Sequence, residues 1–160
     1  EWRRADFRTG DVVPVSGFNS GDWYTAGLTA SGRIAQNIKL DMRGIFRRGD
    51  SALPFQSFDQ WAAEAALTFE FAPPADWMSR NWSIAPFVRW IDTRFDAANP
   101  FIDPLTVRSD HQWSVGALFN APITGNFGIS AAVQYDKTDS SLPNYRLDNF
   151  SVMFGPTARF

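Results

Sequence analysis

The last residues of the chain, Phe150-Ser-Val-Met-Phe-Gly-Pro-Thr-Ala-Arg-Phe160, carry its clearest structural pattern. Every second residue from Phe150 to Phe160 is apolar, and most of the residues between them are polar or small. Successive side chains of a strand point to opposite faces, so this period of two predicts a strand with one apolar face. Such a face on an edge strand invites aggregation in water, whereas a strand in a membrane barrel needs it because lipid is its solvent.

This ending resembles the closing strand of the Gram-negative outer-membrane β-barrel proteins. In that family the last strand ends in Phe after apolar or aromatic residues at alternate positions, and Phe154, Ala158 and Phe160 match this assembly signal. The resemblance implies a location in the bacterial outer membrane. The partners that it implies are outer-membrane lipid and lipopolysaccharide, the barrel-assembly machinery, and a periplasmic partner or upstream domain.

The composition permits this class of protein and excludes others. The chain of 160 residues is 44% hydrophobic and 16% aromatic, with 15 Phe and 7 Trp. No window approaches the length of apolar sequence that a transmembrane helix requires. The strands of a membrane barrel contain no such long apolar window, because every second residue faces the lumen. The net charge of −2 argues against nucleic-acid binding, and the absence of Cys excludes disulfides and thiolate metal sites.

Seven segments have the alternation of strands. They are Asp22–Ile34, Ile38–Phe46, Asp59–Phe71, Asn81–Ile91, His111–Ile123, Phe127–Asp136 and Phe150–Phe160. Short connections at 35–37, 72–80 and 124–126 alternate with long polar ones at 47–58, 92–110 and 137–145, as in barrels with tight periplasmic turns and extended outer loops. In the turn 124–126 we expect Gly125 to supply a positive φ. Residues 61–66 also have helical propensity, but the period of two favours a strand.

Large aromatic residues gather at both ends of these segments, on their apolar faces. Eight to ten residues at ~3.3 Å each and a tilt of ~40° span roughly 20–25 Å, which matches the apolar band of an outer membrane. Trp and Tyr favour the membrane interface because the ring is apolar and its N–H or O–H stays hydrated. A β-sandwich core is the competing interpretation, but it gives no reason to sort aromatics to strand ends. The predicted membrane-interface residues are Tyr24, Trp61, Phe71, Trp82, Trp90, Trp113, Phe127, Tyr135 and Phe160.

The opposite face is predicted to line the lumen. Its polar residues are Arg33, Lys39, Asp41, Arg43, Glu64, Glu70, Arg89, Gln112, Asn120, Gln134, Asp136 and Arg159. Both signs of charge are present, so these side chains could pair across a filled interior or line a wet channel. The sequence leaves both interpretations open.

The predicted fold is all-β: an antiparallel up-and-down transmembrane β-barrel in a single domain over residues 1–160. Bacterial single-chain barrels have even strand numbers, and seven strands are clear. Either Glu1–Val15 supplies an eighth strand, or the chain is the C-terminal segment of a larger barrel. Residues 1–21 therefore stay ambiguous between strand and loop.

No catalytic, metal or cofactor motif is recognisable, and we expect no enzymatic activity. His111 and Ser114 are three residues apart, which places them on opposite faces of a strand. Glu64 and Glu70 lie ~20 Å apart along a strand, too far for paired carboxylate catalysis. The sequence favours a transport or export channel with a polar lumen of mixed charge. The alternatives are a closed structural barrel that anchors surface loops and, as a minor one, an outer-membrane lipid-modifying enzyme.

Overall fold

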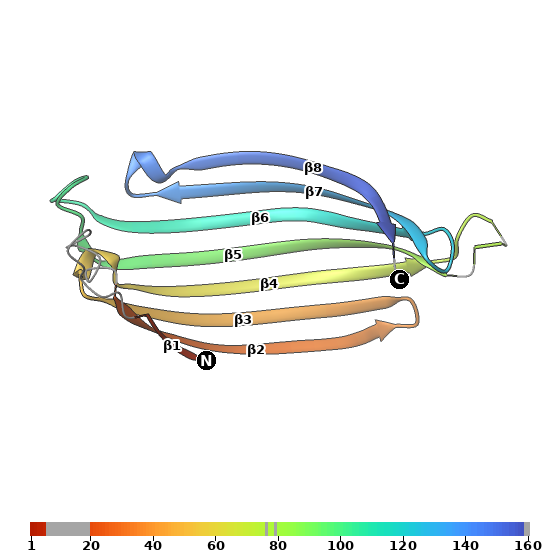
Figure 1. Cartoon of the computed structure of the whole chain (residues 1–160), viewed down its shortest axis with the longest axis horizontal. Coiled ribbons are helices and arrows are strands. Elements are labelled where there is room, and N and C mark those ends of the chain that lie inside the picture. The colour runs from red at the N-terminus through yellow and green to blue at the C-terminus, as the bar shows by residue number, and fades with distance from the viewer. Residues whose placement is uncertain (6–19, 76, 79, 159–160) are drawn as a thin grey trace, which may run out of the picture.

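The computed structural model describes residues 1–5, 20–75, 77–78 and 80–158, which form one antiparallel sheet (Figure 1). Its eight strands are hydrogen-bonded in chain order from β1 to β8. The strands are β1 (Trp2–Ala5), β2 (Gly21–Ala35), β3 (Ile38–Ser51), β4 (Phe58–Phe71), β5 (Trp82–Ala98), β6 (Val107–Pro122), β7 (Phe127–Ser140) and β8 (Leu147–Ala158). The prediction of an all-β, up-and-down antiparallel fold is confirmed, and each of the seven predicted segments is a strand over most of its length, with Arg159 and Phe160 lying outside the described residues.

Two short 3₁₀ helices, η2 (Pro54–Gln56) and η3 (Pro143–Tyr145), lie in connections at the same end of the sheet (Figure 1). No helix among the described residues is both long enough and apolar enough to cross a membrane. Residues 61–66, which have helical propensity, lie inside β4. The alternation of this segment therefore outweighs its local propensity, because β3 and β4 pair over its whole length.

The register of the sheet separates two kinds of side chain. Directly opposed residues of neighbouring strands share a face, so the pairs from β2 to β8 assign every strand residue to one of two faces. One, the apolar face, carries exposed large side chains. They include Leu28, Met42, Trp61, Ile84, Val88, Trp113, Val115, Ile129, Val133, Phe150, Val152 and Phe154. The other, the polar face, carries most of the charged residues in the middle of the strands.

The sheet encloses almost no hydrophobic core. Ala121 and Leu142 are the only buried hydrophobic residues in the described part of the chain, and no large side chain there is fully buried. By contrast, Leu28 is 84% exposed and Phe154 is 85% exposed. No second sheet packs on this one within the described residues, so the β-sandwich interpretation fails for them. No other sheet or helix among residues 1–5, 20–75, 77–78 and 80–158 lies against the apolar face.

The strands extend beyond their predicted ends on the side of the long connections. β3 continues to Ser51, β5 runs on to Ala98, and β7 ends only at Ser140. The predicted loops at 47–58, 92–110 and 137–145 are therefore shorter than expected. Alternation of apolar and polar residues stops at the aromatic level, but backbone pairing continues through polar residues. As a result, connection 72–81, at the end predicted to have short turns, is longer than connection 52–57 at the opposite end. Loop length alone therefore does not distinguish the two ends of the sheet.

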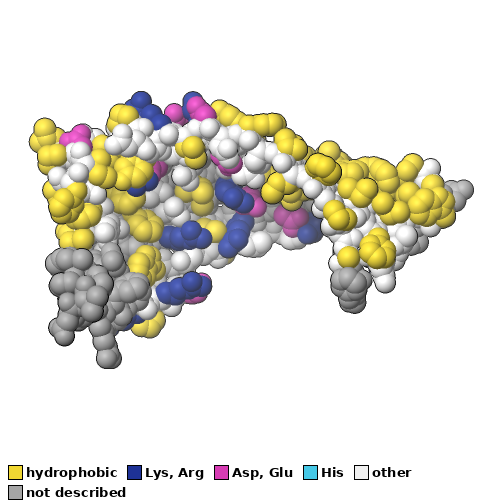
Figure 2. Space-filling model, turned by 45° about the horizontal axis from the view of Figure 1, so that its top comes forward, with side chains coloured by type: hydrophobic (Ala, Val, Ile, Leu, Met, Phe, Trp, Pro, Cys, Tyr) yellow, Lys and Arg dark blue, Asp and Glu magenta, His cyan; other side chains and the backbone are white. Residues whose placement is uncertain are grey.

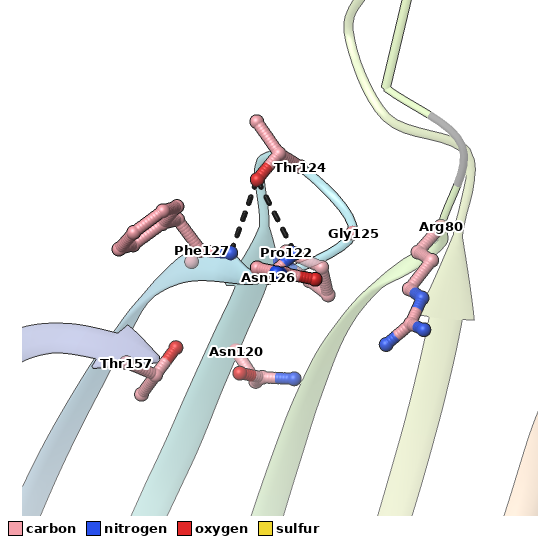
Figure 3. Close-up of a pocket in the computed structure, with 9 residues that line it drawn as sticks. Arg80, Asn120, Pro122, Thr124, Gly125, Asn126, Phe127 and Thr157 are labelled. Carbon is pink, nitrogen blue, oxygen red and sulfur yellow. Dashed lines mark hydrogen bonds between the residues drawn. The ribbon is translucent and has the colours of Figure 1, made fainter. Parts of the chain in front are cut away.

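The turn between β6 and β7 is closed differently from the prediction. No glycine in the described residues has a positive φ, so Gly125 does not supply one. Instead the hydroxyl oxygen of Thr124 accepts hydrogen bonds from the backbone N–H groups of Phe127 at 3.0 Å and Asn126 at 3.3 Å (Figure 3). A side-chain hydroxyl thus replaces the special backbone conformation that a tight turn usually needs.

The connection between β5 and β6 is ordered by a similar side-chain contact. The backbone N–H of Leu105 donates to Oδ1 of Asp103 at 2.9 Å. This bond, together with contacts to Thr106, lowers the pKa of Asp103 because it stabilises the carboxylate form. The loop conformation therefore favours an ionised Asp103.

Part of the N-terminal segment is a strand. Trp2–Ala5 pairs with β2 only over Gly21–Tyr24, with a further pair of backbone bonds between Glu1 and Thr25 at 2.8 Å. Most of the predicted segment beyond residue 5 lies outside the described residues. Among the described strands, β8 pairs only with β7, and β1 covers only the beginning of β2. The sheet is open along these two edges.

Gly116 allows a close contact on the polar face. A Cβ at this position would lie 2.5 Å from the carbonyl oxygen of Val133 and 2.7 Å from Cζ of Phe87. We expect Gly116→Ala to lower the free energy of unfolding by about 1–3 kcal/mol, because the backbone or the Phe87 ring must shift.

Gly44→Ala is the matched control, since a Cβ there meets nothing within 4 Å. This control should change the free energy of unfolding by less than about 0.5 kcal/mol. Urea unfolding of the two variants in detergent, followed by circular dichroism, measures the difference. Equal stability of both variants would contradict the packing of Phe87 over Gly116.

Candidate functional site: the polar face of the sheet

The eleven described residues that were predicted to line a lumen share one face of the sheet. The register joins them in cross-strand rows, for example Arg33 opposite Lys39, and Asn120 opposite Ser83. Charged side chains gather over the middle of the sheet in Figure 2. Arg159, the twelfth predicted residue, lies outside the described residues. The alternation of the sequence was sufficient to place these residues on a common surface.

One row crosses five strands at mid-height. It consists of Arg43, Glu64, Arg89, Ser114 and Asp136, here called the polar ladder. Nε of Arg89 donates to Oε2 of Glu64 at 2.7 Å, and Oγ of Ser114 donates to Oδ1 of Asp136 at 2.6 Å. The ladder thus combines charged and neutral hydrogen-bonding groups.

The ion pairs of the polar face are partly exposed to solvent. Arg89 and Glu64 are 42% and 37% exposed, and similar exposure is found for Lys39 and Asp41, which lie 2.8 Å apart. Arg43 has no carboxylate within 4.0 Å in the described part of the chain, although it lies directly opposite Glu64. The face can therefore exchange partners with solvent or with a solute, because its charges are not locked in buried pairs.

Apolar side chains interrupt the polar face and narrow the space above it. Phe87 lies over Gly116, and Ile45 and Ile91 line a cavity of about 290 Å³ with Arg43 and Arg89. The Phe87 ring thus occupies the space beside Gly116. The polar face therefore carries large apolar side chains as well as polar ones.

The eight described residues that were predicted to lie at membrane interfaces occupy the apolar face, at two levels along the strands. At the first level, near the start of β5, Trp82 stacks edge-on with Phe71 and Phe119, at centroid distances of 6.4 and 5.7 Å. At the second level, near the middle of β5 and β6, Trp90 lies directly opposite Trp113. Tyr24, Trp61 and Tyr135 belong to this second level, and Phe127 to the first. Phe160 lies outside the described residues, whereas Phe154 and Ala158 of the assembly signal lie in β8.

Beyond the second aromatic level the apolar face becomes charged, which the sequence patterns did not indicate. Arg48 binds both carboxylate oxygens of Asp96 at 2.9 and 2.6 Å, and it also contacts Asp50 at 2.7 Å and Asp59 at 3.4 Å. One guanidinium thereby links β3, β4 and β5. Bidentate carboxylate binding of this kind is specific to arginine. No local pattern marks it, because residues 47–51 are polar or Gly at every position and do not alternate.

The residues considered for catalysis do not assemble into a triad. Nδ1 of His111 lies 2.5 Å from Oδ1 of Asp92, on the apolar face. Ser114 lies on the opposite face and is bonded to Asp136. Within the described residues, no three His, Cys, Asp or Glu side chains are placed to hold a metal ion.

Two further cavities open on the polar side at the ends of the sheet. A small one of about 30 Å³ lies beside the turn between β6 and β7, where Arg80, Asn120 and Thr157 surround it (Figure 3). This space is the size of a water molecule. A larger cavity of about 400 Å³ lies at the opposite end, around Arg108. Sequence reasoning missed Arg108 because it placed residues 92–110 in a loop.

Comparison with known proteins provides no relative. No protein-family model, no curated protein and no solved structure is significantly similar to the chain.

The exposure of the polar ladder can be tested by a double-mutant cycle with Glu64→Gln and Arg89→Gln. We expect a coupling energy below about 1 kcal/mol, because water and salt screen a pair that is more than one-third exposed. Urea unfolding in detergent, at low and high salt, measures it. A coupling above about 3 kcal/mol that is insensitive to salt would contradict a hydrated polar face, since buried pairs behave in that way.

Proposed function

We propose that the chain forms all or part of a transmembrane β-barrel in the bacterial outer membrane, with lipid against its apolar face and a passage for a solute or polymer along its polar face. The observation that carries the proposal is the exposure of the apolar face, in a sheet that buries almost no hydrophobic residue. Monomeric soluble proteins rarely expose a continuous apolar patch of this kind. Hydrocarbon is a solvent that makes such a face stable.

The two aromatic levels support the same proposal. Between them the apolar face carries aliphatic and small residues, such as Val88, Val115 and Val133. The charged groups around Arg48 begin only beyond the level of Trp61 and Trp90. A band of aliphatic residues between aromatic levels, followed by charge, is the order of environments across a bilayer.

The proposed barrel requires hydrogen-bond partners for the backbone groups along the two edges of the described sheet. In a bilayer every backbone N–H and C=O group needs a hydrogen-bond partner, so the edges of β2 and β8 must be covered. The sheet itself can close, with β8 meeting β1 and β2, or strands outside the described sheet can pair with these edges. Both arrangements leave the polar face inside.

The polar face supports a passage for water-soluble molecules. Its charges are of both signs and partly exposed, and Arg43 keeps a free charge near mid-height. The alternative is a closed barrel that anchors surface loops, and the packing of Phe87 over Gly116 favours it. Ionic current distinguishes the two functions.

Membrane insertion is tested by a pair of neighbouring substitutions in β2. Leu28 lies on the apolar face and Thr29 on the polar face, and both are exposed. We expect Leu28→Arg to reduce the stability of the inserted protein by about 2–4 kcal/mol, because it places a charge in hydrocarbon. Thr29→Arg is the control and should have little effect. Urea unfolding in lipid vesicles measures both, and equal effects of the two substitutions would refute the assignment of the faces.

The passage is tested by conductance in planar lipid bilayers. We expect steady ionic current from the inserted protein, and a shift of the reversal potential towards anion selectivity in Glu64→Gln, which removes a negative charge from the polar ladder. Asp139→Asn is the matched control, since it removes the same charge beyond the apolar band. No current from correctly inserted protein would contradict the channel and favour the anchoring barrel.

A further inference from the structure

The cavity of about 400 Å³ lies on the polar face, at the end of the sheet that carries the two 3₁₀ helices. Its lining differs in composition from the polar ladder. Its walls come from β4, β5 and β6 and from both 3₁₀ helices. Phe58 and Phe95 lie opposite each other in its floor, and Gln60, Thr93 and Asp110 form the next cross-strand row. Its volume is within the range of small-molecule sites.

Aromatic rings and a guanidinium lie against one another in this cavity. The guanidinium carbon of Arg108 lies 3.5 Å from the centre of the Tyr145 ring and 4.8 Å from that of Phe95. The rings of Phe95 and Phe58 are adjacent, with centroids 5.9 Å apart. Stacking of this kind holds the planar group of Arg108 in one orientation.

The charge of Arg108 is already neutralised. Its Nη2 atom lies 2.6 Å from Oδ2 of Asp110, and Nε donates to the same carboxylate at 2.9 and 3.1 Å. The side chain of Asp110 is only 5% exposed. No other charged residue lines the cavity, so the site has no net charge.

Planar amides supply free hydrogen-bonding groups around this surface. The side chain of Gln112 has no hydrogen-bond partner among the described residues. Asn99 uses its Oδ1 to accept a bond from Phe101, which leaves its amide N–H groups free. Gln60 is held between Arg47 and Thr93, at 3.2 and 3.0 Å, and is already oriented.

We propose that this cavity binds a neutral sugar unit of an oligosaccharide or polysaccharide. The ring of a sugar presents C–H groups on its faces, which pack on Phe, Tyr and stacked Arg, and hydroxyls at its rim, which bond to amides and carboxylates. An anionic ligand would find Arg108 already paired, and an apolar ligand would leave the amides without partners, at a cost for each buried polar group. A neutral ligand with many hydroxyls avoids both costs.

This inference deepens the proposed function, because it gives the passage a substrate class. The binding test does not depend on transport. It uses the whole chain in a detergent without a sugar headgroup and measures the binding of maltohexaose, cellohexaose and the anionic hexagalacturonate by titration calorimetry. We expect a neutral hexaose to bind with a dissociation constant of about 1 mM or lower, and hexagalacturonate to bind more weakly.

Two variants on separate elements connect the binding to this cavity. Gln112→Leu removes the free amide at similar volume, and Tyr145→Ala removes one ring of the stack. Each should weaken binding at least about tenfold. Tyr145→Phe keeps the ring and should retain most of the affinity. Lys39→Ala, elsewhere on the polar face, is the control and should bind as the unsubstituted protein does.

Circular dichroism and urea unfolding identify any variant that fails to fold, and the other variant then carries the test. Absence of binding by both neutral sugars, tighter binding of hexagalacturonate, or binding unchanged in both folded variants would each overturn the inference. Sugar binding without ionic current would sustain this inference while contradicting the channel. Ionic current without sugar binding would support the channel and overturn this inference.

Discussion

The continuous backbone pairing from β2 to β8 determines almost everything else in this molecule. Because directly opposed residues share a face, the pairing of one strand fixes the faces of the next, and the assignment holds across the whole sheet. The two faces are separated only by the backbone layer. Within the described residues, no second layer of secondary structure covers the apolar face.

At the end of the sheet that carries the two 3₁₀ helices, polar side-chain contacts hold the strands together. Below this level the apolar face carries exposed aliphatic side chains. Above it, Arg48 links three strands through carboxylates on the apolar face, and Arg108 is held by Asp110 and two rings on the polar face. Charge-assisted bonds of this kind are strong where water is partly excluded. They allow the hairpins to extend beyond the region that alternation marks.

The sequence predicted the parts of the structure that depend on a period of two. The strands and the sharing of faces follow from alternation, and the observed register agrees with both, whereas the membrane role of the aromatic levels stays a prediction. The outer strand ends could not be found in this way, because residues such as Arg48 and Asp96 look like loop composition until their pairing across strands is known. The cavity around Arg108 combines β4, β5, β6 and η3, and no local pattern connects Tyr145 with Phe95. The prediction of a positive φ at Gly125 was wrong for a different reason. The hydroxyl of Thr124 accepts hydrogen bonds from the backbone of the turn.

The order of sites along the polar face is consistent with passage of neutral, hydroxyl-rich molecules. Under the proposed function, a ligand leaving the cavity around Arg108 would pass from Gln112, in the wall of the cavity, to the polar ladder two residues further along the strand. The ladder pairs Arg89 with Glu64 and Ser114 with Asp136, and with Arg43 it carries two positive and two negative side chains. A charged ligand would compete with these pairs and leave one member without its partner. A neutral ligand can exchange hydrogen bonds with exposed pairs at little cost, because the groups are already hydrated. The same exposure that makes the pairs weak contributors to stability thus makes them suitable for transient contact with a moving solute.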